Sequence, residues 1–338
     1  MPAVCPPPRR TRPLPKITRC ACATSAPTRC RACSTNSSIG GGCGGGLPCG
    51  AEVLRAMFSL ILATYGRVDE IGRLMDSLER QTFRDFELIV ADQNLDQRVL
   101  PYVERARRSG WAVQHLRLAQ PNLSAARNAG ARAATREWMA IPDDDCWYEP
   151  DTLERVARRL SEAASVDGLA IHWQEQVHRV APEADTPLRL ETWRHFQGSD
   201  ASSITLFLRT ATVLSVGGFD ERLGVGQWYG AGEETDLVLA LLANGACIER
   251  LPAARVHHDF GPRPFVSLAA EFRQSRGRAR GWGALCAKHR LPRSTLLKGL
   301  LGPLIWPLIR PDGLAGLVRS AGVLVGRWEG YLNWRLRF

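Results

Sequence analysis

The sequence predicts an α/β fold in which a mainly parallel sheet is flanked by helices and followed by a helical C-terminal extension. Two observations predict it. Between residues 58 and 141, short apolar runs alternate with segments whose apolar residues recur at helical spacing, which is typical of a parallel sheet with crossover helices. From residue 263 onward, longer apolar segments are interrupted by basic residues and prolines, which favours amphipathic helices.

Each element of the alternation has its own signal. Strands are predicted from apolar runs of strand length at 58–63, 86–91, 111–118 and 138–141. Helices are predicted from helical apolar spacing at 69–81, 100–108 and 123–135. In such sheets ligands bind at the carboxyl ends of the strands. We therefore expect Thr64, Asp92 and the acidic triplet Asp143-Asp144-Asp145 to lie along one edge.

Composition divides the chain into 1–56, 57–262 and 263–338. The first region is rich in Pro, Arg, Cys, Ser and Gly without an apolar period, so it is predicted to be disordered. Met57 directly precedes the first strand, and we interpret it as the natural start. A zinc site formed by four cysteines of this region, Cys20, Cys22, Cys30 and Cys33, is one interpretation. No periodic pattern surrounds them to fix the geometry of ligands.

Charge and cysteine usage limit the functions available. The net charge is +10, but both ends are basic and the middle is acidic, which argues against a nucleic-acid-binding surface there. Residues 263–338 carry fourteen Lys or Arg against three acids. Peripheral contact with an anionic membrane surface is one reading, with Trp306, Trp328 and Trp334 as anchors. Helices packed back onto the central region are the alternative. Seven of ten cysteines precede residue 50, and this favours a reducing cytoplasm, including the inner face of the cell membrane.

The acidic triplet directly follows the fourth predicted strand. Three adjacent carboxylates repel one another unless a cation neutralises them. Carboxylate oxygens suit Mg²⁺ or Mn²⁺, which commonly bind through a few carboxylates together with substrate phosphates. Alternation along an extended segment would point Asp143 and Asp145 one way and Asp144 the other. The alternative is a solvated acidic loop.

Two further segments offer groups for a nucleotide. Asp92, at the end of the second predicted strand, could accept the N–H of uracil, thymine or guanine, and a turn or helix cap is the alternative. Asn122 or Ser124 can cap a helix whose N-terminus favours anions. Arg127 on that helix can offer several donors to phosphate, the alternative being an exposed surface arginine.

A glycine-rich segment at 216–232 leads into an acidic helix start with Glu233, Glu234 and Asp236. Acids in a first turn favour the helix dipole, which is a sufficient structural reason for them. One of them could instead act as a general base near a reacting sugar carbon. Downstream, His257 and His258 are placed on a loop after a strand predicted near 247–251. Neutral imidazole is a good ligand for Mn²⁺, although paired histidines on a loop are more often ordinary polar residues.

In this order the motifs resemble those of the family 2 glycosyltransferases of the GT-A fold, over about residues 58–262. The matching segments are Ala63–Arg67, Asp92, Leu123–Gly130, the D-x-D at Asp143 and Asp145, Gly217–Glu221 and Gly232–Leu237. Each motif alone is weak evidence for the family, whereas six motifs in the same order are strong evidence. The resemblance implies metal-dependent, inverting transfer of a sugar from a nucleoside-diphosphate-sugar to a hydroxyl on a glycan or lipid-linked acceptor. Assembly of cell-surface polysaccharide or glycolipid is the expected setting.

The resemblance also implies roles on the nucleotide side of the site. Thr64, Tyr65 and Arg67 would line the nucleotide site. Asp92 would recognise the base, and Arg127 would lie near the diphosphate.

For the metal, the resemblance implies Asp145, with Asp143 acting through the ribose or the metal. Asp144 is counted among the nucleotide-sugar ligands. A downstream histidine would complete the metal shell, and the Pro-x-Ala-x-Val-x-His spacing at 252–258 favours His258 over His257.

The catalytic base would come from the Glu233-Glu234 motif. The family usually has Asp at the second place, so the choice among Glu233, Glu234 and Asp236 stays open.

Other function classes fit less well. A nicotinamide-dependent oxidoreductase needs G-x-G-x-x-G after the first strand, and this chain has Thr64-Tyr-Gly-Arg-Val-Asp69 there. A nucleotidyltransferase would need a glycine-rich basic phosphate loop at the same place. A non-catalytic nucleotide-sugar or glycan-binding module is the remaining alternative, and the complete set of acids argues against it.

Overall fold

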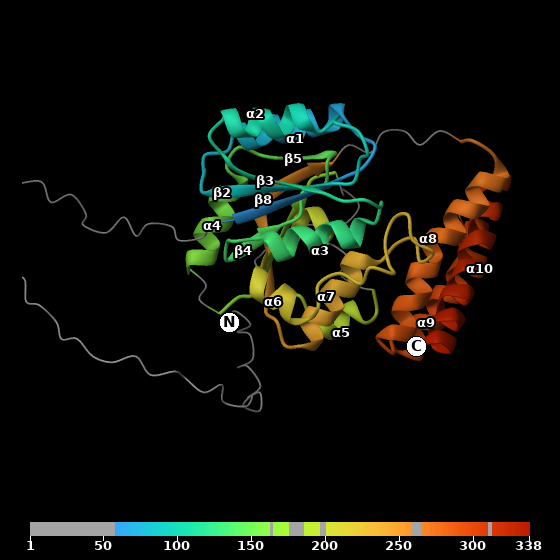
Figure 1. Ribbon diagram of the computed structural model, residues 1–338. Coiled ribbons are helices and arrows are strands. Elements are labelled where there is room, and N and C mark those ends of the chain that lie inside the picture. Colours follow the sequence, from blue (N-terminus) through green and yellow to red (C-terminus); the bar gives the residue numbers. More distant parts are fainter. Residues whose placement is uncertain (1–57, 163–164, 176–185, 197–200, 259–264, 310–312) are drawn as a thin grey trace, which may run out of the picture. The chain divides into compact units, whose positions relative to one another are not determined.

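The computed structural model describes residues 58–338 except 163–164, 176–185, 197–200, 259–264 and 310–312 (Figure 1). The predicted disordered segment 1–56, the proposed start at Met57 and the four cysteines of the zinc-site reading therefore lie outside the described residues.

Eight strands form one sheet in the order β3-β2-β1-β4-β7-β6-β8-β5. They are β1 (Phe58–Thr64), β2 (Phe86–Asp92), β3 (Ala112–Arg117), β4 (Trp138–Ala140), β5 (Cys146–Tyr148), β6 (Gly168–Trp173), β7 (Leu206–Arg209) and β8 (Ile248–His258). The pairs among β1 to β4 are parallel, as the alternating pattern predicted. Strand β7 runs antiparallel to β4 and β6, and β5 runs antiparallel to β8. The sheet is thus mixed.

Of the four described strands after residue 141, the sequence pattern predicted only part of β8. Strands β5 and β7 have three and four residues, and so short a segment shows no measurable period of two. Strand β8, by contrast, has eleven residues and extends well beyond the predicted 247–251. Its last residues therefore carry His257 and His258 within a strand, and the prediction that they lie on a loop was wrong.

Helices cover both faces of the sheet, with α1 and α2 on one face and α3, α6 and α7 on the other (Figure 1). The helices of the central region are α1 (Asp69–Glu79), α2 (Leu100–Arg108), α3 (Leu123–Ala133), α4 (Thr152–Glu162), α5 (Leu190–Trp193), α6 (Thr210–Ser215) and α7 (Glu233–Ala243), with a 3₁₀ turn at Ser203–Thr205. The C-terminal helices are α8 (Leu268–Lys288), α9 (Arg293–Ile309) and α10 (Gly313–Arg337).

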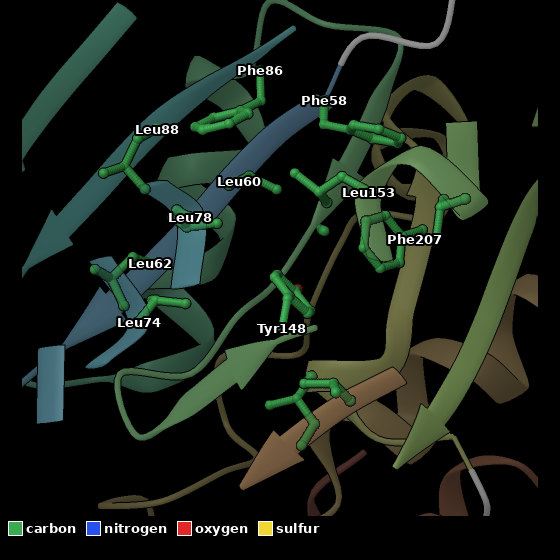
Figure 2. Packing of buried hydrophobic residues seen from close by; sticks show 14 of the residues in the cluster. Phe58, Leu60, Leu62, Leu74, Leu78, Phe86, Leu88, Tyr148, Leu153 and Phe207 are labelled. Atoms are coloured by element: carbon green, nitrogen blue, oxygen red, sulfur yellow. The ribbon is translucent and has the colours of Figure 1, made fainter. Parts of the chain in front are cut away.

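Strand β1 is buried on both faces, which explains its uninterrupted apolar run. Leu60 and Leu62 pack with Leu74 of α1 in one hydrophobic cluster, which Figure 2 shows together with residues of β2, α4 and β7. Ile61 belongs to the cluster on the opposite face, with residues of α3 and α7. Burial of this apolar surface stabilises the sheet whose edge carries the polar residues described below.

Helix α3 lies unusually close to β1. The side chain of Asn122 caps it by accepting a hydrogen bond of 3.0 Å from the backbone N–H of Ala125. At Gly130, a Cβ would stand only 2.3 Å from a side-chain methyl of Ile61, so glycine is needed for this approach. The close contact brings Arg127 of α3 against the ends of the neighbouring strands.

The C-terminal helices pack through glycines. On α10, Gly322, Gly326 and Gly330 face the backbone of α8, and a Cβ on each would lie within 2.7 Å of an α8 carbonyl oxygen. Helix α8 is in turn joined to the central region, because Lys288 Nζ lies 2.6 Å from Asp220 and 2.7 Å from Asp236. The alternative of packing back onto the central region is thus confirmed for α8. Across the part of the chain that the structure describes, no helix combines the length and apolarity that crossing a bilayer requires.

Candidate functional site

Three segments far apart in sequence meet at one edge of the sheet, as predicted. Thr64 at the end of β1 pairs with Asp92 at the end of β2. Asp143 forms an isolated parallel β-bridge with Ala63 of β1. The loops beyond the strands are tied together, because the backbone N–H of Gly66 donates to Asn94 Oδ1 at 2.7 Å.

The acidic triplet does not alternate as an extended segment would. Asp143 accepts a hydrogen bond of 2.8 Å from Arg127 Nη2. Arg67 Nη1 contacts both Asp144, at 3.1 Å, and Asp145. The backbone N–H of Cys146 closes a turn onto the carbonyl of Asp143 at 3.2 Å. Because the triplet lies in a turn, Asp144 and Asp145 share a partner, and the prediction that Asp144 points away from Asp145 was wrong.

Each carboxylate of the triplet has a distinct electrostatic environment. Burial raises the pKa of Asp144 to about 6, against the hydrogen bond of 2.7 Å that Thr64 Oγ1 donates to it. Burial also opposes the charge of Asp145, but His258 and Arg67 outweigh it and lower the pKa of that carboxyl. Asp145 is therefore held as a carboxylate, which is the form that binds a cation.

Strand pairing brings His258 to the triplet. In the antiparallel pair of β5 and β8, Cys146 lies opposite His258, and His258 Nε2 comes to 3.1 Å from Asp145 Oδ1. The adjacent His257 has other partners, since its Nδ1 lies 2.7 Å from Glu175 and its ring stacks on Trp147. Only His258 of the two faces the acidic triplet.

The chemistry of this pair fits a divalent ion. Asp145 offers an oxygen and His258 a nitrogen at one point, the ligand types that Mn²⁺ accepts. Within the described ranges, no group of three or more His, Cys, Asp or Glu side chains forms a complete protein cage. A partial ligand set is typical of ions that take their other ligands from substrate phosphates and water.

Arg127 is buried rather than exposed on the surface. Its side chain is 1% exposed. Nη2 donates to Asp143 and, at 2.9 Å, to Ser203 Oγ, while Nη1 donates to Glu233 Oε1 at 3.2 Å. Burial disfavours the guanidinium charge, but Asp143 and Glu233 outweigh it and raise the pKa of Arg127. One cation thus joins the acidic triplet to the start of α7.

The start of α7 holds the three acids predicted as candidates for a base. Gly232, with φ of +97°, turns the chain into the helix. Burial and the neighbouring Glu233 raise the pKa of Glu234 well above its ordinary value. Asp236 is engaged elsewhere, with Lys288 Nζ and His289 Nε2 each 2.7 Å away. Glu234 has no ion pair with a basic side chain in the described part of the chain.

Asp92 is fully buried and does not cap a helix, but its side chain accepts from the backbone N–H two residues on, as the turn alternative predicts. Its Oδ1 accepts from the backbone N–H of Asn94 at 2.9 Å and from the Asn94 amide at 2.8 Å. Its Oδ2 lies 3.0 Å from His115 Nε2 and 3.3 Å from Arg117 Nη1. Both oxygens therefore have internal partners. Tyr65 lies beyond the strand end and is 58% exposed.

Sequence reasoning missed four partners of these residues, namely Asn94, His115, Arg117 and Ser203. His115 and Arg117 could have been found, because residues two apart on a strand share a face and β3 lies beside β2. Ser203 carries no sequence signal, because its place in the site comes from its tertiary contacts with Arg127 and Asp143.

Residues 59–209 match the model of glycosyl transferase family 2. An uncharacterised glycosyltransferase of Haemophilus influenzae is 32% identical over 113 residues, 33% of this chain and 37% of that protein. A PGL/p-HBAD biosynthesis glycosyltransferase of Mycobacterium tuberculosis is 33% identical over 108 residues, 31% of this chain and 42% of that protein. The match spans less than half the length of these curated relatives.

Solved structures show the same fold. S. aureus TarS 1–349 in complex with UDP-GlcNAc has a TM-score of 0.53 at 19% identity, covering 82% of this chain and 92% of that one. The mannosyltransferase PcManGT from Pyrobaculum calidifontis, in complex with GDP-Man and Mn²⁺, has a TM-score of 0.57 at 14% identity, covering 83% and 84%. The mixed sheet and its flanking helices are those of the GT-A type, and residues 59–209 are similar to glycosyl transferase family 2.

Proposed function

We propose that this protein transfers a sugar from a nucleoside-diphosphate-sugar to a hydroxyl acceptor, with a divalent metal and with inversion at the anomeric carbon. The observation that carries the proposal is the position of Arg127. It connects Asp143, in the acidic triplet, to Glu233, beside Glu234. Groups suited to holding a donor and groups suited to activating an acceptor thus belong to one buried network.

On the donor side, Asp145 and His258 would hold Mn²⁺ or Mg²⁺, with Asp143 close by through the ribose or the metal. When bound, such an ion neutralises negative charge on the leaving nucleoside diphosphate. Thr64 and Arg67 lie against the triplet. Residues proposed to line the nucleotide site are Thr64, Tyr65, Arg67, Asp92, Asp143 and Asp144.

On the acceptor side, Glu234 is our choice for the general base. Glu233 is held by Arg127, and Asp236 is held by two basic side chains of the C-terminal region. A carboxylate with a raised pKa takes up a proton near neutral pH more readily than an ordinary one, which suits it to accept the proton of an acceptor hydroxyl. Direct attack by that hydroxyl on the anomeric carbon would invert the configuration in one displacement.

We further propose peripheral contact with an anionic membrane surface, where a glycan or lipid-linked acceptor would be met at the cytoplasmic face. Its support is a stripe on α10 of exposed apolar side chains separated by three, four or eight residues, namely Leu314, Leu317, Val325, Trp328, Leu332 and Leu336. The described acids nearby are neutralised by arginines, Glu271 by Arg319 and Glu329 by Arg276. An apolar and cationic face suits the surface of an anionic bilayer. Assembly of cell-surface polysaccharide or glycolipid would fit this location.

The direct test is turnover and binding by the full chain. UDP-, GDP- and dTDP-sugars would be assayed for hydrolysis and transfer with and without Mn²⁺, and UDP, GDP and dTDP would be titrated calorimetrically. Metal-dependent release of one nucleoside diphosphate is the expected result. Tight binding of a nucleotide-sugar without turnover of any donor would instead identify a binding module.

A further inference from the structure

A cavity of about 320 Å³ lies between α8 and α10. We call it the arginine cavity. Its lining includes Gln274, Ser275, Arg278 and Trp282 from α8, and Arg319 and Arg327 from α10. None of these residues belongs to the acidic site, so the proposed glycosyl transfer does not account for the cavity.

The charges around the arginine cavity do not balance. Glu271 is the acidic residue in the lining, and its carboxylate is paired with Arg319 Nε at 3.1 Å. Arg278 is exposed and Arg327 is partly buried. Neither of these two arginines has an ion pair with a carboxylate among the described residues. Two positive charges of the cavity therefore have no carboxylate partner within the described part of the chain.

Arg327 is the more unusual of the two. Its guanidinium lies over the ring of Trp282 at 4.4 Å, and Nη1 donates to the carbonyl of Gly299. Its Nε is buried without a hydrogen-bond partner in the described structure. Burial lowers the pKa of Arg327, and no carboxylate acts against it. A guanidinium held in this way keeps an N–H donor without an acceptor, and a bound anion would stabilise its charge.

We propose that the arginine cavity binds a phosphate group. The forked donors of two arginines match the geometry of phosphate oxygens better than single ammonium groups do. Trp282 fixes the plane of the Arg327 guanidinium, and the amide of Gln274 adds a neutral donor at the rim. Free phosphate and the headgroup of an anionic lipid both present this chemistry.

The test uses the full chain and two probes. Inorganic phosphate is titrated calorimetrically, and binding is measured by flotation with vesicles of phosphatidylcholine alone and of phosphatidylcholine with an equal part of phosphatidic acid. Arg278→Ala and Arg327→Gln are compared with Arg273→Ala, which removes an exposed arginine of the same helix outside the cavity. Each cavity variant is expected to weaken binding about tenfold, the size of one charge-assisted hydrogen bond. The control should bind like the parent.

The outcomes separate the sources and can overturn the proposal. Binding of inorganic phosphate alone identifies a soluble phosphate, and binding only to phosphatidic acid vesicles identifies a lipid headgroup. The proposal is overturned if neither probe binds, or if Arg273→Ala weakens binding as much as the cavity variants do. Arg278 is exposed and has no ion pair with any described residue, so its replacement decides the matter even if Arg327→Gln fails to fold. Because donor turnover is measured separately, failure here leaves the proposed transferase activity untouched.

Discussion

Arg127 Nη1 lies 3.2 Å from Glu233 Oε1, although 106 residues separate the two in the chain. The other terminal nitrogen of the same guanidinium donates to Asp143 at 2.8 Å. The Arg127 side chain is 1% exposed. It binds one carboxylate of the acidic triplet, which was predicted to hold the metal and the donor, and one carboxylate of the α7 motif, which was predicted to supply the base. Arg127 therefore joins the acidic triplet to α7, and the role near the diphosphate that the family resemblance implies stays a prediction.

Replacing Arg127 tests that role. Arg127→Ala would leave Asp143 and Glu233 without their shared cation in a buried site, so we expect the free energy of unfolding to fall by about 3–5 kcal/mol. Urea denaturation measures the change. Arg132→Ala, on the exposed side of α3, is the matched control and should be near neutral. If Arg127→Ala keeps the parent stability and loses only donor affinity, the diphosphate role is correct.

Glu234→Gln tests the choice of base. The substitution keeps the shape and removes the proton acceptor, so transfer is expected to fall about 10²–10⁴-fold while donor binding is unchanged. Initial rates and donor titration measure the two effects, and NMR of the product gives the anomeric configuration. Near-normal transfer by the variant would move the role to Glu233 or another group.

Asp236→Asn tests whether another acid at the start of α7 has a structural or a catalytic role, and it is compared with Glu234→Gln. Asp236 holds Lys288 and His289, so its replacement should lower the melting temperature and loosen the joint between α7 and α8. A loss of transfer with unchanged stability would place Asp236 in the chemistry instead.

The two adjacent histidines give a matched pair for the metal site. His258 lies 3.1 Å from Asp145, whereas His257 contacts Glu175. We expect His258→Ala and Asp145→Ala each to weaken Mn²⁺-dependent donor binding by more than about tenfold, since even indirect partners of a metal ligand have effects of this size. His257→Ala should bind like the parent in the same calorimetric titration. Equal losses for both histidines would contradict the assignment.

Asp144 gives a prediction for pH. Its pKa is raised from 3.8 to about 6 in the folded protein, so the folded state holds its proton more tightly than the unfolded chain does. The stability from this group is present below pH 3.8 and is lost as pH rises through about 6. Relative to the parent, Asp144→Asn should therefore gain up to about 3 kcal/mol between pH 4 and 7. Urea unfolding across this range, with chelator present, measures the difference, and a difference independent of pH would contradict it.

The exposed stripe on α10 gives a prediction for lipid binding. Leu317 is 54% exposed, and a charge there would have to enter the apolar part of the interface. We expect Leu317→Glu to reduce binding to vesicles containing phosphatidylglycerol about tenfold, from the loss of one buried leucine. Leu95→Glu replaces an exposed leucine of the central region, 88% exposed, and is the control. Flotation that is equal for both variants and the parent would exclude the stripe as the contact.

The pattern of amino acids is sufficient to predict the first half of the sheet and the edge at which the candidate site lies. The apolar periods of β1, α1, β2 and α3 are local properties, and they can be read without knowing any partner. Parallel strands joined by helices bring their carboxyl ends to one edge. This rule alone brought Thr64, Asp92 and Asp143 together before any contact was known, and the resemblance to family 2 glycosyltransferases rested on the same segments.

Which of these groups are in contact depends on the tertiary packing. The turn at the acidic triplet gives Asp144 and Asp145 a common partner in Arg67, and strand β8 continues far enough to bring His258 beside them. The contact between Arg127 and Glu233 depends on how α3 packs against β1 and where α7 begins. Such pairings join residues many positions apart, and their distances follow from packing rather than from any local period.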